Sequence, residues 1–241
     1  MLTYDYTKSI RKTWFDKTTE KVDKVIPVLA IPVLNRYDLL DQNLETIDYP
    51  IKEILILNNG KEPYEPKRKD LNVRVLNLPS NLGMSGSWNL TIKLYPHEEY
   101  WMFSSADTQW IPGSLQKLSE SSGKDKVVMT TEGWSCFSIG EDIIREVGLF
   151  DEFFYPIYFE DNDYYERVMR SKVKDGYVHG VIEVNVPHGA SQTINSDDSL
   201  KRRNHETFIV NEAYFQQKKN QDFKIDGVWN IDRRRAQEWL R

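Results

Sequence analysis

The chain of 241 residues contains a single cysteine, Cys136, and only four histidines. A lone cysteine excludes an intramolecular disulfide, and no group of cysteines and histidines has the spacing of a zinc finger. These absences favour a reducing compartment, so we predict a cytoplasmic location. We expect Cys136 to be packed in a strand without a chemical role.

Long apolar runs are missing as well. No stretch approaches the roughly 20 apolar residues that a membrane-spanning helix needs, and the first residues are too polar for a signal peptide. The net charge of −5 excludes the basic excess that is typical of nucleic-acid binding. We therefore expect a soluble protein with no transmembrane segment and no nucleic-acid partner.

Short apolar segments alternate with helical patterns along the chain. We predict strands over residues 24–34, 53–57, 73–78, 100–103, 127–131, 135–139 and 181–186. We predict helices over 38–47, 89–94, 141–147, 160–170 and 199–219, and one more that opens at Ile111-Pro112-Gly113. This alternation predicts an α/β fold with a mostly parallel central sheet flanked by helices, and a ligand beyond the carboxyl ends of the strands.

The chain divides into three parts on this pattern. Residues 1–23 form an arm, 24–195 one catalytic domain, and 196–241 a C-terminal helical extension and tail. Within the domain, 24–110 would form the nucleotide-binding part and 111–195 the acceptor and catalytic part. The arm could pack on the domain or on a second subunit, which leaves a homodimer open. We expect the last helix to be amphipathic. Its packed side would consist of Leu200, Phe208, Ile209, Ala213 and Tyr214.

Asp107 stands at the end of a predicted strand, after small residues. A carboxylate in this position could reach a divalent cation that bridges two phosphates. An Asp that only caps a turn is also very common, so this residue alone does not decide between the two roles.

Glu160, Asp161 and Asp163 place three acids within four residues at the start of a predicted helix, directly after an aromatic run. The helix dipole stabilises such acids without any function. However, the dipole lowers the pKa of a carboxyl whereas an aromatic wall raises it, and together they can leave a base that is ionised and partly desolvated. Capping and catalysis are both open here.

His188 follows a predicted strand, and we expect this strand to align with the one that ends at Asp107, so that both side chains approach one metal ion. A histidine that is merely packed or exposed is the alternative. The segment 81–89, NLGMSGSWN, is rich in glycine and serine and allows a phosphate or a sugar to approach the backbone at a helix start. It is neither a Walker P-loop nor a GxGxxG fingerprint.

Taken in order, these segments resemble the GT-A fold glycosyltransferases of the family-2 type, especially their rhamnosyl- and galactofuranosyltransferase-like branch, over about residues 25–219. The most specific stretch is VGLFDEFFYPIYFEDNDYYERV, residues 147–168. The resemblance implies a GT-A, Rossmann-like sheet, Asp161 as the catalytic base and His188 as a late metal-binding histidine. The family's acidic metal motif normally has two or three acids, whereas Ser105-Ala106-Asp107 retains only the last.

The resemblance also assigns substrate contacts. Nucleotide-sugar contacts fall on Pro32, Val33, Leu34, Asn35 and Arg36, on Asn58 and Asn59, on Asn81, Gly83, Met84 and Ser85, and on Ser105 and Ala106. Asn58 stands where the family commonly has an acid that contacts the base. Contacts with the acceptor or the sugar fall on Trp134, Glu160, Asp163 and Ser191.

The function that we expect is an inverting transfer of a sugar from a UDP-, dTDP- or GDP-linked donor to a hydroxyl of a carbohydrate or other acceptor. Asp107 and His188 would hold Mn²⁺, which tolerates a histidine nitrogen better than Mg²⁺ does. A non-catalytic nucleotide- or carbohydrate-binding module is the alternative. A sugar nucleotidylyltransferase is disfavoured, because the segment 32–36 lacks a phosphate loop rich in glycine and arginine.

Overall fold

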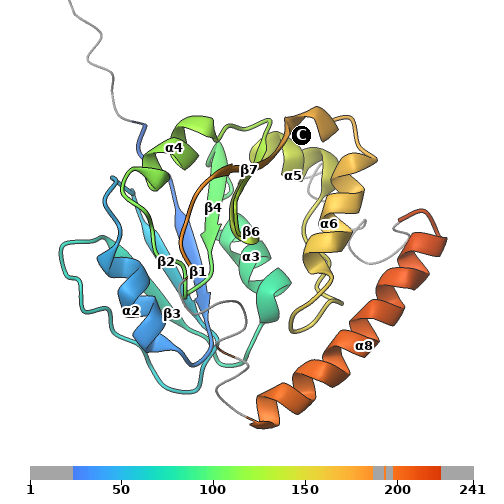
Figure 1. The fold of residues 1–241 in the computed structure, drawn as a ribbon, viewed down its shortest axis with the longest axis horizontal. Helices are drawn as coiled ribbons and strands as arrows, with labels where there is room; N and C mark the ends of the chain where they lie inside the picture. Colours follow the sequence, from blue (N-terminus) through green and yellow to red (C-terminus); the bar gives the residue numbers. More distant parts are fainter. Residues whose placement is uncertain (1–23, 187–192, 194–197, 224–241) are drawn as a thin grey trace, which may run out of the picture.

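The computed structural model describes residues 24–186, Thr193 and residues 198–223. Its centre is a seven-stranded sheet with the order β3-β2-β1-β4-β6-β5-β7 (Figure 1). The strands are β1 Leu29–Val33, β2 Ile54–Asn58, β3 Val73–Asn77, β4 Tyr100–Ser104, β5 Val127–Thr130, β6 Gly133–Gly140 and β7 Tyr177–Ile182. The helices are α2 Tyr37–Glu45, α3 Gly83–Leu94, α4 Ser114–Ser121, α5 Glu141–Val147, α6 Glu160–Met169 and α8 Asp198–Asn220, with a short 3₁₀ turn, η1 Lys174–Gly176.

One strand runs against the others. β6 pairs antiparallel with β4 and with β5, whereas the pairs β1–β2, β2–β3, β1–β4 and β5–β7 are parallel. The reversal follows from the chain, because a two-residue connection after β5 permits only a hairpin. The predicted α/β class with a mostly parallel sheet is confirmed.

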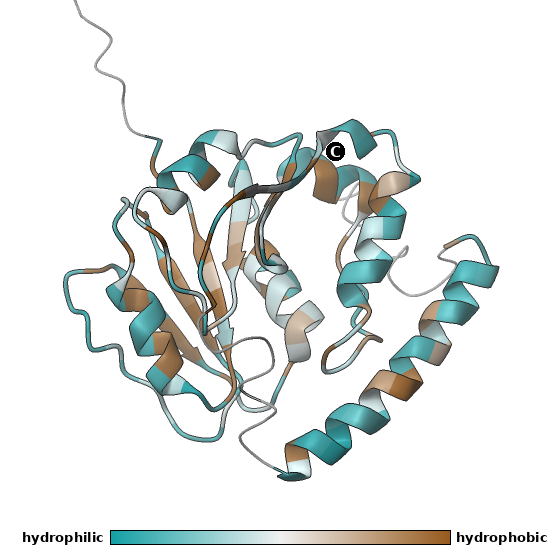
Figure 2. Ribbon diagram, in the orientation of Figure 1, coloured by the Kyte–Doolittle hydropathy of each residue, from teal (hydrophilic) through white to brown (hydrophobic). Residues whose placement is uncertain are grey.

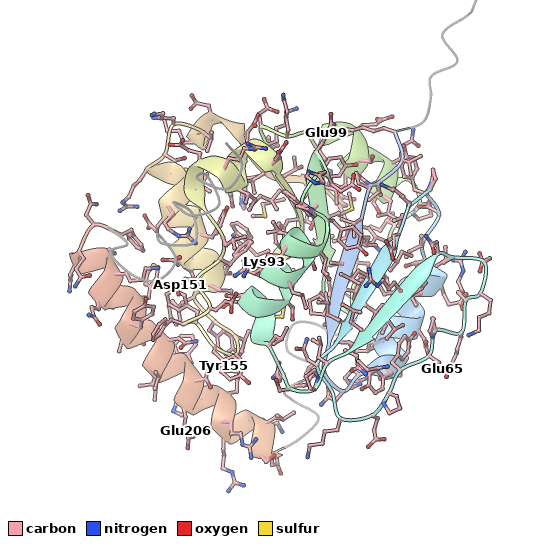
Figure 3. All side chains as sticks on the ribbon, turned by 180° about the vertical axis from the view of Figure 1, so that it is seen from behind. Glu65, Lys93, Glu99, Asp151, Tyr155 and Glu206 are labelled. Carbon is pink, nitrogen blue, oxygen red and sulfur yellow. The ribbon has the colours of Figure 1, made fainter. Side chains whose placement is uncertain are left out.

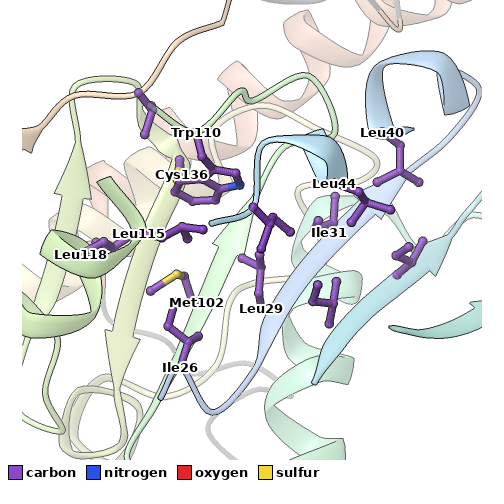
Figure 4. Packing of buried hydrophobic residues seen from close by; sticks show 14 of the residues in the cluster. Ile26, Leu29, Ile31, Leu40, Leu44, Met102, Trp110, Leu115, Leu118 and Cys136 are labelled. Atoms are coloured by element: carbon purple, nitrogen blue, oxygen red, sulfur yellow. The ribbon is translucent and has the colours of Figure 1, made fainter. Parts of the chain in front are cut away.

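Both faces of the sheet are covered by helices. Successive residues of a strand point to opposite faces, so Leu29 and Ile31 join one apolar cluster while Ala30 joins the other. The first cluster includes Leu40 of α2 and Leu115 of α4, and Figure 4 shows how these side chains meet those of β1 and β4. The second cluster receives side chains from α3, α5 and α6: Trp88, Ile92, Ile143, Tyr164 and Val168. The strands between them are therefore apolar on both sides.

The amino-terminal edge of the sheet is closed by contacts between backbones. A Cβ atom at Gly140 would lie 2.2 Å from the carbonyl oxygen of Lys124, and one at Gly176 would lie 2.0 Å from the carbonyl oxygen of Asp125. Only glycine fits at these two positions, because any side chain would overlap the neighbouring backbone.

The long helix α8 lies beside α6 and away from the sheet (Figure 1). The packed side that we predicted for it is right only in part. The rings of Phe208 and Tyr214 contact aromatic rings of the loop before α6, whereas Ile209 is 54% exposed and the buried residues of α8 are Asn211 and Lys218. Figure 2 shows that polar residues dominate most of its length. The reason is that the loop presents carbonyl and carboxylate oxygens as well as rings, and these oxygens need hydrogen-bond donors.

Two boundaries also differ from the prediction. The glycine-rich segment belongs to α3, which begins at Gly83 and not at residue 89, and Gly83 has the positive φ of 70° that glycine adopts without strain. The last strand is earlier than expected, at Tyr177–Ile182. Within the described part of the chain, none of the helices combines the length and the apolar character that a bilayer crossing requires.

Candidate active site

The polar residues after β1, β4 and β5 gather at the carboxyl edge of the sheet. The loop after β4 is fixed to the start of β6 by a hydrogen bond from the Ser105 amide to the Ser135 carbonyl, 2.7 Å. Asp107 follows in this loop and is half-buried. The pKa of the Arg36 guanidinium is raised, mainly by its hydrogen bond with Asp38 and to a lesser extent by the charge of Asp107. The structure thus brings Arg36 and Asp107, two of the predicted site residues, close together.

The chain after β7 returns to this edge. Asn185 and Gln109 exchange two backbone hydrogen bonds, 2.7 and 3.0 Å long, and Asn35 donates a side-chain hydrogen bond to the carbonyl of Thr193, 3.3 Å. The strand alignment that we expected is therefore wrong in detail, because β6 and β5 separate β7 from β4. The segments beyond the two strands are nevertheless paired. His188 and Ser191 lie outside the described residues, so their roles stay predictions.

Asp161 lies in the first turn of α6 and is half-buried. Its Oδ1 accepts a hydrogen bond from the Asn162 amide, 2.8 Å. Burial raises the pKa of the Asp161 carboxyl, and the backbone hydrogen bonds of Asn162 and of Asp161 itself partly oppose this effect. The pKa of Tyr177 is raised to about 12, mainly by burial and then by the charges of Tyr165 and Asp161. Asp161 therefore lies near the Tyr177 ring. The Trp134 ring lies 6.4 Å from the Tyr177 ring, so both rings belong to one aromatic group in this region.

Glu160 is 5% exposed, and its Oε2 has no hydrogen-bond partner in the described part of the chain. Burial and, second, the charge of Asp161 raise the pKa of the Glu160 carboxyl to about 8. At neutral pH the Glu160 carboxyl is therefore mostly protonated, which leaves Asp161 as the neighbouring carboxyl that can act as a base. This arrangement suits a single general base.

Asp163 has a different environment from the one we expected. Its side chain is fully buried, and it forms ion pairs with Arg167 Nε, 2.8 Å, and with Lys218 Nζ, 2.5 Å. These partners occupy the carboxylate inside the protein, between α6 and α8. We therefore do not include Asp163 among the residues that contact a substrate.

The side-chain amide of Asn58 is fully used by the protein. Its Oδ1 accepts hydrogen bonds from Tyr37 Oη, 2.9 Å, and from the Gly60 amide, 3.0 Å. Its Nδ2 donates to the carbonyl of Glu62 and to Asn77 Oδ1, both at 2.7 Å. Asn58 thus fixes the loop after β2, and no polar atom of its side chain is left for a nucleobase.

The glycine-rich start of α3 is also capped by the protein itself. The amide of Leu82 donates to Asn59 Oδ1, that of Gly83 to Asn81 Oδ1, and that of Met84 to the carbonyl of Pro156. These amides would otherwise be free to bind an anion. Ser85 keeps a buried Oγ without a hydrogen-bond partner in the described residues. A diphosphate contact here stays a prediction, and Ser85 is the group that could make it.

A metal site is incomplete in the described part of the chain. No three His, Cys, Asp or Glu side chains among these residues form a cluster that could hold a metal ion. Asp107 offers one hard carboxylate oxygen, which Mn²⁺ and Mg²⁺ accept, and a bound diphosphate would supply further oxygens. The carboxylate of Asp107 and the diphosphate oxygens together fit a metal ion that binds along with the nucleotide.

Sequence reasoning missed several residues that shape the site. Asn89 of α3 exchanges hydrogen bonds with the backbone of Phe150, 2.8 and 2.9 Å, and so fixes the start of the loop that leads to α6. Asn211 and Lys218 of α8 bind the same loop further along. Asn89 is a polar residue between apolar neighbours, and this pattern in the sequence could have indicated its role in fixing the loop.

The sheet order, with polar loops and two adjacent carboxyls at its carboxyl edge, defines an α/β protein that binds its ligand beyond the strand ends. A comparison with models of protein families identifies the family within this class. Residues 28–174 match the model of glycosyl transferase family 2, and the chain belongs to this family. A search of curated protein sequences finds no match.

A comparison with solved structures finds similar proteins at low sequence identity, and one of them supports the same fold. The structure of TarS from S. aureus superposes with a TM-score of 0.52 and 13% identity, over 66% of this chain and 36% of that chain. The mannosyltransferase PcManGT from Pyrobaculum calidifontis, in complex with GDP-Man and Mn²⁺, gives a TM-score of 0.49 and 14% identity, over 71% of this chain and 60% of that chain. The chain thus spans less than two thirds of either protein. The common fold is the GT-A fold.

Proposed function

We propose that this family-2 protein transfers a hexosyl group from a nucleotide diphosphate sugar to an acceptor hydroxyl with inversion, and that Asp161 is its general base. The observation that carries the proposal is the Glu160–Asp161 pair. Asp161 is half-buried in the first turn of α6, and burial raises the pKa of its carboxyl, while the buried Glu160 beside it has a pKa raised to about 8. The rhamnosyl- and galactofuranosyltransferase-like branch is the part of the family that we favour.

In the proposed reaction Asp161 takes the proton of the acceptor hydroxyl while that oxygen attacks the anomeric carbon of the donor sugar. The bond between this carbon and the diphosphate oxygen breaks, and its electron pair leaves with the nucleoside diphosphate. A new glycosidic bond forms on the opposite face of the sugar. Trp134, whose ring is partly exposed and lies 6.4 Å from that of Tyr177, would contact the sugar or the acceptor.

The diphosphate would lie near Arg36 and Asp107. Arg36 carries a permanent positive charge at the end of β1. Asp107, with His188 as a second predicted ligand, would hold Mn²⁺ or Mg²⁺, which stabilises the charge of a leaving diphosphate as a Lewis acid. The nucleotide would be a UDP, dTDP or GDP derivative.

The substitution Asp161→Asn tests the assignment. It removes the base but keeps the shape of the side chain, so turnover should fall about 10²–10⁴-fold. Binding of the nucleotide sugar, measured by calorimetry with Mn²⁺, should change little. Asp125→Asn, an exposed carboxylate at the opposite edge of the sheet, is the matched control and should keep the wild-type rate.

Two results would contradict the proposal. Wild-type turnover in Asp161→Asn would exclude this residue as the base. Nucleotide binding that is independent of metal, with no transfer or hydrolysis of any donor, would support the non-catalytic binding module instead.

A further inference from the structure

The helix α8 contacts the segment that leads into Asp161, although α8 lies outside the residues that match the family model. Two of its buried side chains make these contacts, Asn211 near the middle and Lys218 near the end. Figure 1 shows α8 alongside α6, and Figure 3 shows Asp151, a partner of Lys218, on the side of the molecule that faces α8. The contacts of α8 therefore concern the entry to α6 and not the sheet.

Asn211 binds two consecutive backbone carbonyls of this entry. Its side chain is 3% exposed, and its Nδ2 donates hydrogen bonds to the carbonyl oxygens of Ile157, 2.9 Å, and Tyr158, 3.2 Å. Both donor hydrogens of the amide are thus used on the chain three and four residues before Asp161. Buried carbonyls without a donor are costly, so these two bonds favour one backbone conformation.

The backbone that Asn211 binds is strained. Tyr158 has a φ of 83° and Phe159 a φ of 71°, values that residues other than glycine rarely adopt. Such a conformation persists only when its surroundings over-determine it. Aromatic side chains of α8 add to this hold, because the Phe208 ring lies 5.4 Å from that of Tyr158 and 5.0 Å from that of Phe159.

We infer that Asn211 is a positioning residue, which fixes the strained turn at Tyr158 and Phe159 and thereby sets the direction in which Asp161 points. The inference rests on the proposed function of Asp161. Without the two hydrogen bonds, the left-handed turn can relax and the first turn of α6 can rotate. The carboxylate would then leave its half-buried position near Tyr177, and a displacement of about 1 Å can cost on the order of 10²-fold in rate.

The first experiment compares steady-state kinetics of Asn211→Leu with the wild type. Leu has a similar size but no donor, so we expect kcat to fall about 10–100-fold. The KM for the donor should change less than about twofold, because the hydrogen bonds of Asn211 go to Ile157 and Tyr158 and not to the segments that carry Arg36 and Asp107. The acid limb of the pH–rate profile should move to lower pH, since Asp161 becomes more hydrated. Asn211→Gln, which keeps the amide donors, should recover part of kcat, and Glu212→Gln, exposed on the same helix, is the control.

An unchanged kcat, or an unchanged pH profile at reduced kcat, would overturn the inference.

The second experiment is independent of activity. Amide hydrogen exchange should become faster in residues 157–163 of Asn211→Leu, with no change in β1 and β2. Unchanged exchange in residues 157–163 would refute the positioning role. If Asn211→Leu does not fold, Asn211→Ser takes its place in both experiments. If the wild type transfers no sugar from any donor, the proposed function fails, while the exchange data still decide whether Asn211 fixes this turn.

Discussion

The ammonium group of Lys218 lies 2.5 Å from Oδ1 of Asp163, two residues beyond Asp161 in α6. The same ammonium is 2.6 Å from Oδ2 of Asp151, and the Lys218 side chain is only 7% exposed. Arg167 pairs with the other oxygen of Asp163, so two buried cations balance two buried carboxylates, and Lys218 links the two carboxylates. This network, together with Asn211, attaches α8 to the part of the chain that carries the proposed base.

We expect Lys218→Ala to lower the free energy of unfolding by about 3–5 kcal/mol, because removal of one partner leaves buried charge uncompensated. Urea unfolding at pH 7 measures the change. Lys219→Ala, the exposed neighbour, should stay within about 0.5 kcal/mol of the wild type. Equal effects of the two substitutions would show that the Lys218 ion pairs do not stabilise the fold.

Glu160→Gln should stabilise the protein increasingly as the pH rises. The ordinary pKa of this carboxyl is 4.5, and burial first, then the charge of Asp161, raises it to about 8 in the folded protein. Between these values the folded state binds more protons than the unfolded state, so the wild type loses stability as the pH rises. Glutamine does not titrate, and the gain should grow from near zero at pH 4 to about 3–5 kcal/mol above pH 8.

Urea unfolding of both proteins over this pH range measures the difference. Glu206→Gln on the exposed side of α8 is the control, and its difference from the wild type should stay within about 0.5 kcal/mol at every pH. A constant difference between Glu160→Gln and the wild type across the range would mean that the Glu160 carboxyl ionises normally in the folded state.

Asp107→Asn should weaken the effect of metal on nucleotide binding. The amide is a poorer ligand for a hard divalent cation than the carboxylate, so we expect the affinity that Mn²⁺ adds to nucleoside diphosphate binding to fall about 10–100-fold. Calorimetry with UDP, dTDP and GDP, each with and without Mn²⁺, measures this. Asp125→Asn again serves as the control. The same Mn²⁺ dependence in wild type and Asp107→Asn would exclude Asp107 as a metal ligand.

Much of the fold could be predicted because the strands are apolar on both faces and the turns between them are polar. The strand and helix pattern from β1 to α6 follows directly from this contrast, and the starts of α5 and α6 agree with prediction to the residue. The antiparallel β6 was not expected as such, since short apolar runs carry no information about direction.

The side chains that fix the loops could not be predicted in the same way. Asn59 and Asn211 have backbone partners far along the chain, and Asn58 binds the distant side chains of Tyr37 and Asn77. These pairings exist only after the chain has folded. The packed side of α8 was assigned only in part for a related reason. Phe208 and Tyr214 pack on rings as expected, but the surface also presents oxygen atoms, so Asn211 and Lys218 are buried and Ile209 is not.

The contacts of Gly140 and Gly176 with neighbouring backbone limit where this protein can vary. An added residue or a larger side chain at that edge would push β5 and β6 apart, and the error would spread through the sheet. Changes of substrate preference, whether by evolution or by engineering, are therefore restricted to the opposite edge, where loop length can change while the strands keep their register.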